Sequence, residues 1–380
     1  MRRYVDPYPF DPEAEVPLTP EQERLYTASQ WRLVWMRFRR HKLAVVSLVV
    51  LALLYASIVV TEVLAPYTLD SRHASHVYAP PQPVHLFHDG AFVGPFVYPL
   101  SFQLNMETMQ REYTVDRSEP QRLRWFCRGE PYRFWGTFEA DWRLFCPPAD
   151  GTAFLLGTDR LGRDMLSRIL HGARISLTIG LFGVAVSFVL GVTLGGLAGY
   201  VGGLVDGAIQ RVIEIIRSFP VIPLWMALSA ALPVSWDPLW VYFGITIILG
   251  LVDWPGLARA VRGRILSLRE EDFAQAAIFM GARPRRVIGR HLVPSFASHL
   301  IASVTLAIPT MILGETALSF LGLGLRPPIT SWGVLLTEAQ NINAVALYPW
   351  LMLPVVPVIL VVLAFNFVGD GLRDAADPYS

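Results

Sequence analysis

The sequence predicts an all-α integral membrane protein with six transmembrane helices and a small folded insert between the first and the second. Three observations support this fold class. First, 53% of the 380 residues are hydrophobic, which is more apolar surface than a single soluble core would bury. Second, the apolar residues occur in blocks long enough to cross a bilayer. Third, the basic residues are unevenly distributed among the connections between these blocks.

A bilayer core about 30 Å thick requires about 20 apolar residues in a helix, because every backbone polar group must be satisfied within the segment. The first such stretch follows a polar segment and is expected to be a retained anchor rather than a cleaved signal. Pro220, inside the third, favours a kink. The six stretches cover residues 43–65, 175–199, 208–232, 238–257, 295–320 and 349–368.

The basic residues predict the orientation, because arginine and lysine collect in cytoplasmic connections. Arg40 and Lys42 precede the first stretch and place the N-terminus in the cytoplasm. The connection 258–294 is rich in arginine, whereas 321–348 carries only Arg326. Six crossings then leave both termini in the cytoplasm and the insert outside.

These inferences divide the chain into consecutive parts with different locations. The core is expected to hold the last five transmembrane helices and a cytoplasmic coupling loop. The predicted parts are a cytoplasmic N-terminal tail (1–42), the first transmembrane helix (43–65), an extracytoplasmic insert (66–173), the core (174–369, with the loop at 258–294) and a cytoplasmic C-terminal tail (370–380).

Both cysteines of the chain, Cys127 and Cys146, lie in the insert. An oxidising compartment permits a disulfide there, and a bridge closing a loop of this size stabilises a fold by about 3 kcal/mol. We expect the disulfide, with two unrelated buried thiols as the alternative.

Four histidines of the insert have a spacing that would allow a metal site. They are His73, His76, His85 and His88. Prolines at 80, 81 and 83 separate the two pairs and favour an extended, solvated segment instead. We therefore predict no metal site.

Small residues recur every four positions in the second stretch and would line one face of its helix. A helix backbone can approach closely along such a face. We expect a helix of the same chain there, and a helix of another subunit is the alternative. The small residues are Gly183, Ser187, Gly191, Gly195 and Gly199.

The internal segment 268–294 has helical periodicity rather than the composition of a simple loop. A spacing of i, i+3, i+4 and i+7 gives one apolar face, made of Phe273, Ala276, Ala277 and Met280. Gly281 is expected to end this helix, because glycine readily adopts positive φ.

A second short helix is predicted after Gly281, since Pro284 suits a first helical turn. It carries Val287, Ile288 and Leu292 along one side, before Pro294 leads into the fifth stretch. The two helices would project from the membrane, and their apolar face is expected to enter a groove on a partner protein.

This loop resembles a signature of bacterial binding-protein-dependent ABC permeases: Glu-Ala-Ala, three residues, Gly, nine residues, Ile, one residue, Leu-Pro. At the same spacing this chain has Gln275-Ala276-Ala277, Gly281, His291 and Val293-Pro294. Gln275, His291 and Val293 depart from the signature. The resemblance implies that coupling to an ATPase involves Gln275, Ala276, Ala277, Gly281, Arg283 and Pro294.

Further segments resemble the dipeptide/oligopeptide/nickel permease family, in particular its OppC- and DppC-like subunits. The resemblance implies the type I ABC importer permease fold, and residues 67–150 lie outside it. The segments are Leu156-Gly157-Thr158-Asp159, Gly172-Ala173-Arg174, Arg217-Ser218-Phe219-Pro220, Glu315-Thr316-Ala317-Leu318 and Ser331-Trp332-Gly333.

The resemblance further implies an assembly in the bacterial inner membrane. This chain would pair with a second homologous permease, bind two cytoplasmic ATPases that hold ATP and magnesium, and receive peptides from an external solute-binding protein. Nickel and oligosaccharides are alternative substrates.

No cofactor is expected on this chain, because a phosphate-binding loop needs Gly-Lys-Ser/Thr and the only lysine, Lys42, lies between His41 and Leu43. No clustered basic face suggests nucleic-acid binding.

An ion-coupled secondary transporter is the first alternative, because charges inside a membrane are costly and often functional. The candidates are Asp253, expected near the inner end of the fourth stretch, and Glu315, expected near the outer end of the fifth. Arg211, Glu214 and Arg217 are spaced three apart and are expected to form an ion cluster on one helix face.

A membrane enzyme is the second alternative, although the sequence has neither a His-Glu-x-x-His nor a Gly-x-Ser-x-Gly motif. Asp159, Arg163 and Asp164 resemble a catalytic carboxylate group. They precede the second stretch beside Arg160 and Arg168, so helix capping and surface salt bridges are the expected roles. We predict no enzymatic activity.

Overall fold

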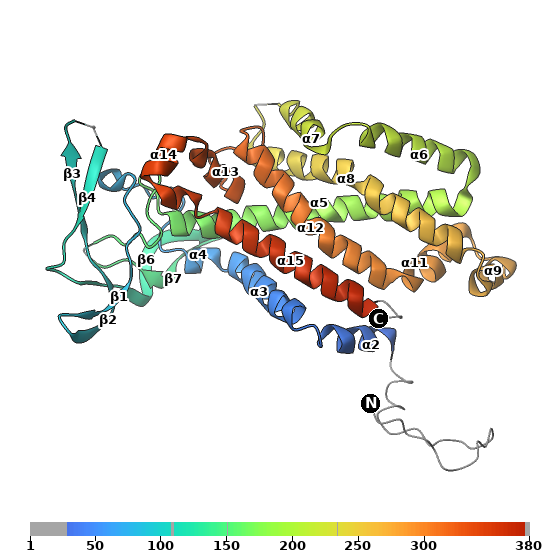
Figure 1. Ribbon diagram of the computed structural model, residues 1–380, viewed down its shortest axis with the longest axis horizontal. Coiled ribbons are helices and arrows are strands. Elements are labelled where there is room, and N and C mark those ends of the chain that lie inside the picture. The colour runs from blue at the N-terminus through green and yellow to red at the C-terminus, as the bar shows by residue number, and fades with distance from the viewer. Residues whose placement is uncertain (1–28, 108–109, 150, 234, 377–380) are drawn as a thin grey trace, which may run out of the picture.

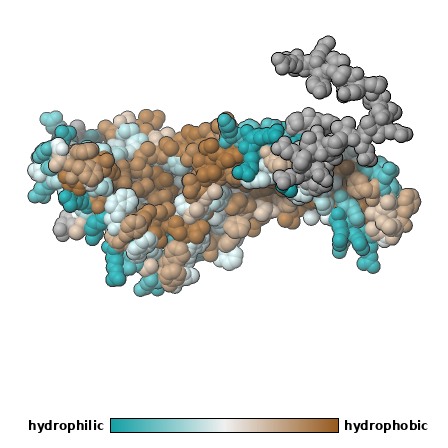
Figure 2. Space-filling model, turned by 90° about the horizontal axis from the view of Figure 1, so that it is seen from below, coloured by the Kyte–Doolittle hydropathy of each residue, from teal (hydrophilic) through white to brown (hydrophobic). Residues whose placement is uncertain are grey.

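The computed structural model describes residues 29–376 except 108–109, 150 and 234. Most of the predicted N-terminal tail (1–28) and the last residues of the C-terminal tail (377–380) lie outside the described part. Long helices form an elongated bundle, and a β-rich insert caps one end of it (Figure 1). On the face in Figure 2, hydrophobic side chains cover much of the middle of the bundle.

Within the described residues, five helical segments are long and apolar enough to cross a membrane. A sixth crossing requires the pair α6 (Gly203–Arg217) and α7 (Val221–Ala230), which is bent by 87°. The chain is therefore mostly helical, with five to six candidate membrane spans. The five segments are α3 (Lys42–Val59), α5 (Met165–Val201), α8 (Pro238–Leu268), α12 (Ala297–Phe320) and Pro349–Ala376, which contains η4 (Pro349–Met352) and α15 (Val355–Ala376).

The third stretch, predicted as one helix over 208–232, is broken in the structure. α6 ends at Arg217 and α7 begins at Val221. Pro220 explains the break, because it lacks an N–H and disfavours helical backbone in the residue before it. The kink expected at this proline is thus a nearly perpendicular bend.

Two helices extend beyond their predicted ends. α5 begins at Met165, before the boundary expected at 174, because Asp164 caps it: the Asp164 carboxylate accepts a hydrogen bond from the Ser167 N–H at 2.7 Å. α8 continues to Leu268 rather than ending at 257. Its last turns are polar and carry the helix out of the apolar stretch into the segment predicted as loop.

The insert departs from the all-α prediction, since it consists of three small antiparallel sheets. The first has the order β1-β2-β5, the second pairs β3 with β4, and the third pairs β6 with β7. The strands are β1 (His85–His88), β2 (Ala91–Val97), β3 (Leu100–Asn105), β4 (Gln110–Val115), β5 (Gln121–Arg122), β6 (Arg124–Phe134) and β7 (Phe138–Cys146).

Two hairpin turns explain why this region forms strands. Asp89 and Gly90 join β1 to β2 with φ of 49° and 80°, and Trp135 and Gly136 join β6 to β7 with φ of 47° and 70°. Two consecutive positive φ angles are the geometry of a type I′ turn, whose twist matches paired strands. Asp-Gly between apolar residues is a strong hairpin signal, which the prediction of an unspecified folded insert did not use.

Short helices occupy both ends of the bundle. α13 enters the bundle near the insert, where its Trp332 is fully buried and donates from Nε1 to the Ile169 carbonyl at 3.1 Å. The short elements are α2 (Gln30–Phe38), α4 (Thr61–Leu64), η1 (Ala74–His76), α9 (Asp272–Phe279), α10 (Pro284–Arg286), the π-helix η2 (Val287–Leu292), α11 (Val293–Ser295), α13 (Trp332–Leu336), η3 (Thr337–Gln340) and α14 (Ile342–Leu347).

The small-residue face of α5 packs against α8 of the same chain, as expected. A methyl group added to Gly199 would lie 2.8 Å from the Arg262 carbonyl oxygen, and one added to Gly191 would lie 2.9 Å from the Leu257 side chain. Gly183 faces both Met311 of α12 and the backbone of α8 at Thr246. Close packing of these helices therefore depends on the absence of side chains on α5.

Candidate functional site

The predicted coupling loop lies at the end of the bundle opposite the insert, where α9 projects beyond the long helices (Figure 1). It follows α8 directly and leads through α10, η2 and α11 into α12. The two-helix arrangement around Gly281 is confirmed, although the second helix is a short α-helical turn followed by a π-helix.

Gly281 ends α9 with a φ of 78°. The Gly281 N–H donates to the Ile278 carbonyl at 2.9 Å, and the Ala282 N–H donates to the Ala277 carbonyl at 3.1 Å. These two bonds form a Schellman motif. A Cβ at Gly281 would meet no atom within 4 Å, so backbone conformation rather than space requires glycine here.

α9 divides its apolar residues between two faces, which the predicted single face did not anticipate. Ala274 and Ala277 are buried, and Ala274 packs in a cluster with Val261 and Ile265 of α8. Phe273, Ala276 and Met280 are exposed, and Phe279 is 86% exposed. Alanine on the inner face lets α9 lie close to the bundle and turns its large side chains outward.

The second helix uses its apolar side to attach to the bundle. Val287 and Leu292 are fully buried and Ile288 is partly buried in the cluster that contains Phe296 and Leu300 of the α12 end. This side was predicted to enter a partner's groove, and that expectation was wrong, because it packs within the chain. The arginines of the second helix remain at the surface: Arg285, Arg286 and Arg290.

The remaining signature residues hold the loop together. The Gln275 Nε2 donates to the Arg269 carbonyl at 2.9 Å, which ties α9 to the end of α8. Arg283 precedes α10 as its N-cap residue with an extended backbone, and Pro294 lies in the first turn of α11. Gln275 thus makes an intramolecular bond at the position where the signature has glutamate.

At the insert end, four charged side chains form a network that joins the start of α5 and the residues before it to a distant segment of the chain. Asp159 pairs with Arg163 at 2.7 Å and also with Arg168, and both arginines approach Glu338 at 3.8 and 3.5 Å. The expected role as salt bridges is correct, but the expected surface location is wrong, since Asp159 is fully buried and Arg168 nearly so. Burial raises the pKa of the Glu338 carboxyl.

Asp164 caps α5 from a buried position next to this network. Its Oδ2 accepts from the Ser167 N–H and hydroxyl, both at 2.7 Å, while Oδ1 has no hydrogen-bond partner among the described residues. Burial raises the pKa of Asp164 to about 6, because the carboxylate loses more hydration than the serine bonds restore.

Glu315 does not reach water, contrary to the prediction. It is fully buried and accepts from the hydroxyls of Ser176 at 3.1 Å, Ser319 at 2.8 Å and Ser331 at 2.6 Å. Ser176 also accepts from the Trp332 N–H at 3.2 Å. The carboxyl therefore joins α5, α12 and the start of α13, and its contacts favour a structural role over ion transport.

The position of Asp253 also differs from expectation, whereas the pairing predicted on the third stretch is confirmed for Arg211 and Glu214. Asp253 lies in the middle of α8 rather than near its inner end, because the helix continues to Leu268. It lines a cavity of about 190 Å³ with Ser187 and Ser303. Arg211 and Glu214 form an exposed pair at 2.9 Å on α6.

The insert is fixed to the bundle by a second charge cluster that the sequence did not reveal. Arg174 of α5 donates to both carboxylate oxygens of Glu62 at 2.7 Å. Trp135, at the β6–β7 turn, donates from Nε1 to the Val59 carbonyl at 2.9 Å and lies under the Arg174 guanidinium. Buried Arg143 of β7 donates to the Ala65 carbonyl. The hairpin tip therefore sits on the end of α3.

Cys127 and Cys146 form a disulfide that links β6 to β7. The four histidines lie in two separate aromatic environments. His73 and His76 pack on Phe154, and the His88 Nδ1 is 3.0 Å from the Tyr98 hydroxyl. Within the described residues, no three His, Cys, Asp or Glu side chains form a group that could hold a metal.

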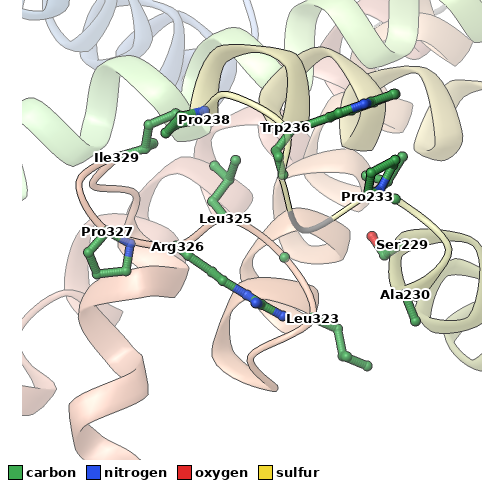
Figure 3. A pocket seen from close by; sticks show the side chains of 13 residues that line it. Ser229, Ala230, Pro233, Trp236, Pro238, Leu323, Leu325, Arg326, Pro327 and Ile329 are labelled. Atoms are coloured by element: carbon green, nitrogen blue, oxygen red, sulfur yellow. The ribbon is translucent and has the colours of Figure 1, made fainter.

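A pocket of about 210 Å³ opens at the insert end between α7, the start of α8 and the segment that follows α12 (Figure 3). Trp236, Leu325 and Arg326 are among its lining residues. The sequence had singled out Arg326 only as the sole basic residue of its connection.

Two family models match the chain. Residues 191–379 match the binding-protein-dependent transport system inner membrane component, and residues 29–81 match the N-terminal TM domain of oligopeptide transport permease C. The matches cover the bundle from the second half of α5 onward, together with the first span and the segments on either side of it.

Named relatives agree with these models. The oligopeptide transport system permease protein OppC of Haemophilus influenzae is 40% identical over 252 residues, which are 65% of this chain and 78% of that protein. The dipeptide transport system permease protein DppC of Alkalihalophilus pseudofirmus is 41% identical, covering 58% of this chain and 71% of its own length. The glutathione transport system permease protein GsiD of Pectobacterium atrosepticum is 39% identical, covering 60% and 73%.

Among solved structures, the inward-facing MetNI methionine ABC transporter matches with a TM-score of 0.44 and 20% identity, over 56% of this chain and 97% of the matched chain. The sequence relationships to the permeases are much closer and extend over most of each relative. The chain therefore belongs to the family of binding-protein-dependent transport system inner membrane components and is a multi-pass inner-membrane permease of the oligopeptide and dipeptide type.

Proposed function

We propose that this chain is one permease subunit of an ATP-binding-cassette importer and forms part of the path by which peptides cross the inner membrane. The exposed surface of α9 carries this proposal. Phe279 and Met280 are 86% and 81% exposed at a helix end beyond the membrane spans, where large apolar side chains are unfavourable unless a partner covers them. The Gly281 turn holds them in place from within the chain.

A cytoplasmic ATPase is the partner that best fits this surface. The chain cannot form a phosphate-binding loop, because Lys42 is its only lysine and follows a histidine. Energy must then come from another polypeptide, which would hold ATP and magnesium. Gln275, Ala276, Ala277, Gly281, Arg283 and Pro294 belong to the segment that would transmit its motion.

The loop is built to move together with two spans. Gln275 ties α9 to the end of α8, and the buried side chains Val287 and Leu292 attach the second helix to the start of α12. An ATPase that displaced α9 would therefore shift α8 and α12 rather than bend the loop, which is how packed elements respond to a local push. In the proposed type I importer fold, the bent α6–α7 pair is the third of six spans.

The remaining parts of the assembly follow from the same function. A second homologous permease would complete the pathway, and an external solute-binding protein would deliver the substrate. Both termini and the coupling loop would then lie in the cytoplasm, with the insert outside. Peptides are the substrate class because relatives are named for oligopeptide, dipeptide and glutathione transport. Nickel and oligosaccharides remain alternative cargoes.

Copurification and reconstitution test this function. The tagged chain, expressed with its neighbouring genes, should copurify with a second permease and two ATPases. In proteoliposomes the assembly should transport a labelled tripeptide only when ATP is present on the side of the ATPases and binding protein is present on the opposite side. Uptake driven by a proton gradient without any ATPase would instead establish the secondary transporter.

A further inference from the structure

The pocket at the insert end is separate from the coupling loop. It is bounded by the end of α7, by the connection between α7 and α8, and by the segment after α12 (Figure 3). Trp236, Pro233 and Leu325 give it apolar walls. It lies at the end of the bundle where a substrate delivered from the insert side would enter.

Among the described residues that line the pocket, Arg326 is the only charged one. Its side chain is exposed and runs along one side of the space, and its Nη2 donates a hydrogen bond to the Gly322 carbonyl at 3.3 Å. Asp237 is the acidic residue between two lining residues, but its Oδ1 already accepts from the Leu239 N–H at 2.9 Å as the cap of α8. Arg326 therefore gives the lining of the pocket a positive charge.

Ser229 provides a second, independent observation. Its side chain lines the same pocket, and the residue is only 5% exposed. Its hydroxyl has no hydrogen-bond partner among the described residues. A buried hydroxyl without a partner is costly, so a ligand with an acceptor oxygen that reached into the pocket would satisfy it.

We propose that this pocket binds the C-terminal carboxylate of the incoming peptide, with Arg326 and Ser229 as its donors, an assignment that rests on the proposed import of peptides. A guanidinium matches the two oxygens of a carboxylate and forms charge-assisted hydrogen bonds with them. Every unmodified peptide carries this group whatever its sequence. The apolar walls around Trp236 would accommodate the last side chain without selecting one residue type.

The experiment compares uptake of labelled trialanine with uptake of its C-terminal amide by the reconstituted assembly. The same binding protein is used throughout, so its own preference cancels when variants are compared. Arg326→Gln should lower uptake of the free acid about tenfold at limiting concentration and leave uptake of the amide unchanged, because only the acid loses a charge-assisted bond. Arg326→Lys should give an intermediate loss, and Ser229→Ala a smaller one.

Arg117→Gln is the matched control, because it removes an exposed positive charge from the insert at the same end of the molecule. It should change uptake of neither peptide. The site is overturned if Arg326→Gln reduces uptake of both peptides equally or of neither. That result is expected if Arg326 binds a lipid phosphate or only stabilises its own loop. A wild-type assembly that imported neither peptide would overturn the proposed function together with this site.

Discussion

At the residue scale, Gly281 is the position where one substitution should separate ATP hydrolysis from transport. Gly281→Val places a β-branched residue at a φ of 78°, which costs at least about 1 kcal/mol and displaces the end of α9. We expect the reconstituted assembly to hydrolyse ATP while peptide uptake falls at least about tenfold. Both rates are measured on the same proteoliposomes.

Gly289→Val is the matched control, because Gly289 also has no atom within 4 Å of its Cβ position but shows no positive φ. It should leave both rates close to wild type. Normal uptake by the Gly281 variant would show that the Schellman turn does not transmit the motion of the ATPase.

Asp164 should give the protein a measurable pH dependence of stability. Its pKa is about 6 in the folded chain against an ordinary value of 3.8, so the folded state binds more protons between these two values. Its contribution is therefore fully present below pH 4 and is lost as the pH rises through 6, by about 3 kcal/mol. Asp164→Asn keeps a capping side chain but cannot ionise.

Thermal unfolding in detergent between pH 4 and 8 checks this prediction. Asp164→Asn should gain stability relative to wild type as the pH increases. Asp237→Asn, at the exposed cap of α8, should leave the pH dependence unchanged. Parallel stability profiles for wild type and Asp164→Asn would contradict the assignment of the titration to this carboxyl.

At the scale of elements, the attachment of the insert depends on Arg174. Arg174→Gln leaves the Glu62 carboxylate buried without its charge partner, and loss of one member of such a pair costs about 3 kcal/mol. We expect the β6–β7 hairpin to detach from α3, so that its amides exchange with deuterium faster while those of α8 stay protected. Hydrogen exchange measured by mass spectrometry resolves the two regions.

Arg128→Gln serves as the comparison, since its pair with Asp141 is exposed and 3.8 Å long and such pairs contribute little. Its exchange pattern should match wild type. Unchanged exchange in the Arg174 variant would mean that Trp135 and Arg143 hold the hairpin on the bundle without Arg174.

At the scale of the whole molecule, the orientation in the membrane can be measured directly. The bonded pair Cys127 and Cys146 leaves no free thiol among the described residues, so a single introduced cysteine can be labelled specifically. Glu271→Cys, beside α9, should react with a membrane-impermeant maleimide only in inside-out vesicles. Thr137→Cys, in the β6–β7 turn, should react only from the outside of intact spheroplasts. The reverse pattern would invert the proposed topology.

The coupling loop shows how far sequence reasoning reached. The spacing of Gly281 and Pro284 predicted a helix, a glycine turn and a second helix start, because positive φ and a missing N–H are local properties of those residues. Periodicity also found the apolar residues of α9. It could not divide them between two faces, because alanine and phenylalanine count alike in a periodic pattern, whereas the tertiary structure buries Ala277 and leaves Phe273 exposed.

The position of the insert and the burial of the charged side chains could not be predicted from local sequence patterns. Asp89-Gly90 was a hairpin signal in the sequence, but the position of the β6–β7 hairpin on the bundle depends on long-range bonds such as the one from Trp135 Nε1 to the Val59 carbonyl. The burial of Glu315 likewise depends on serines from two other segments. Spans, turns and caps follow from the chemistry of neighbouring residues, and the sequence determined them. Which charges are buried, and with which partners, depends on distant segments that only the tertiary structure brings together.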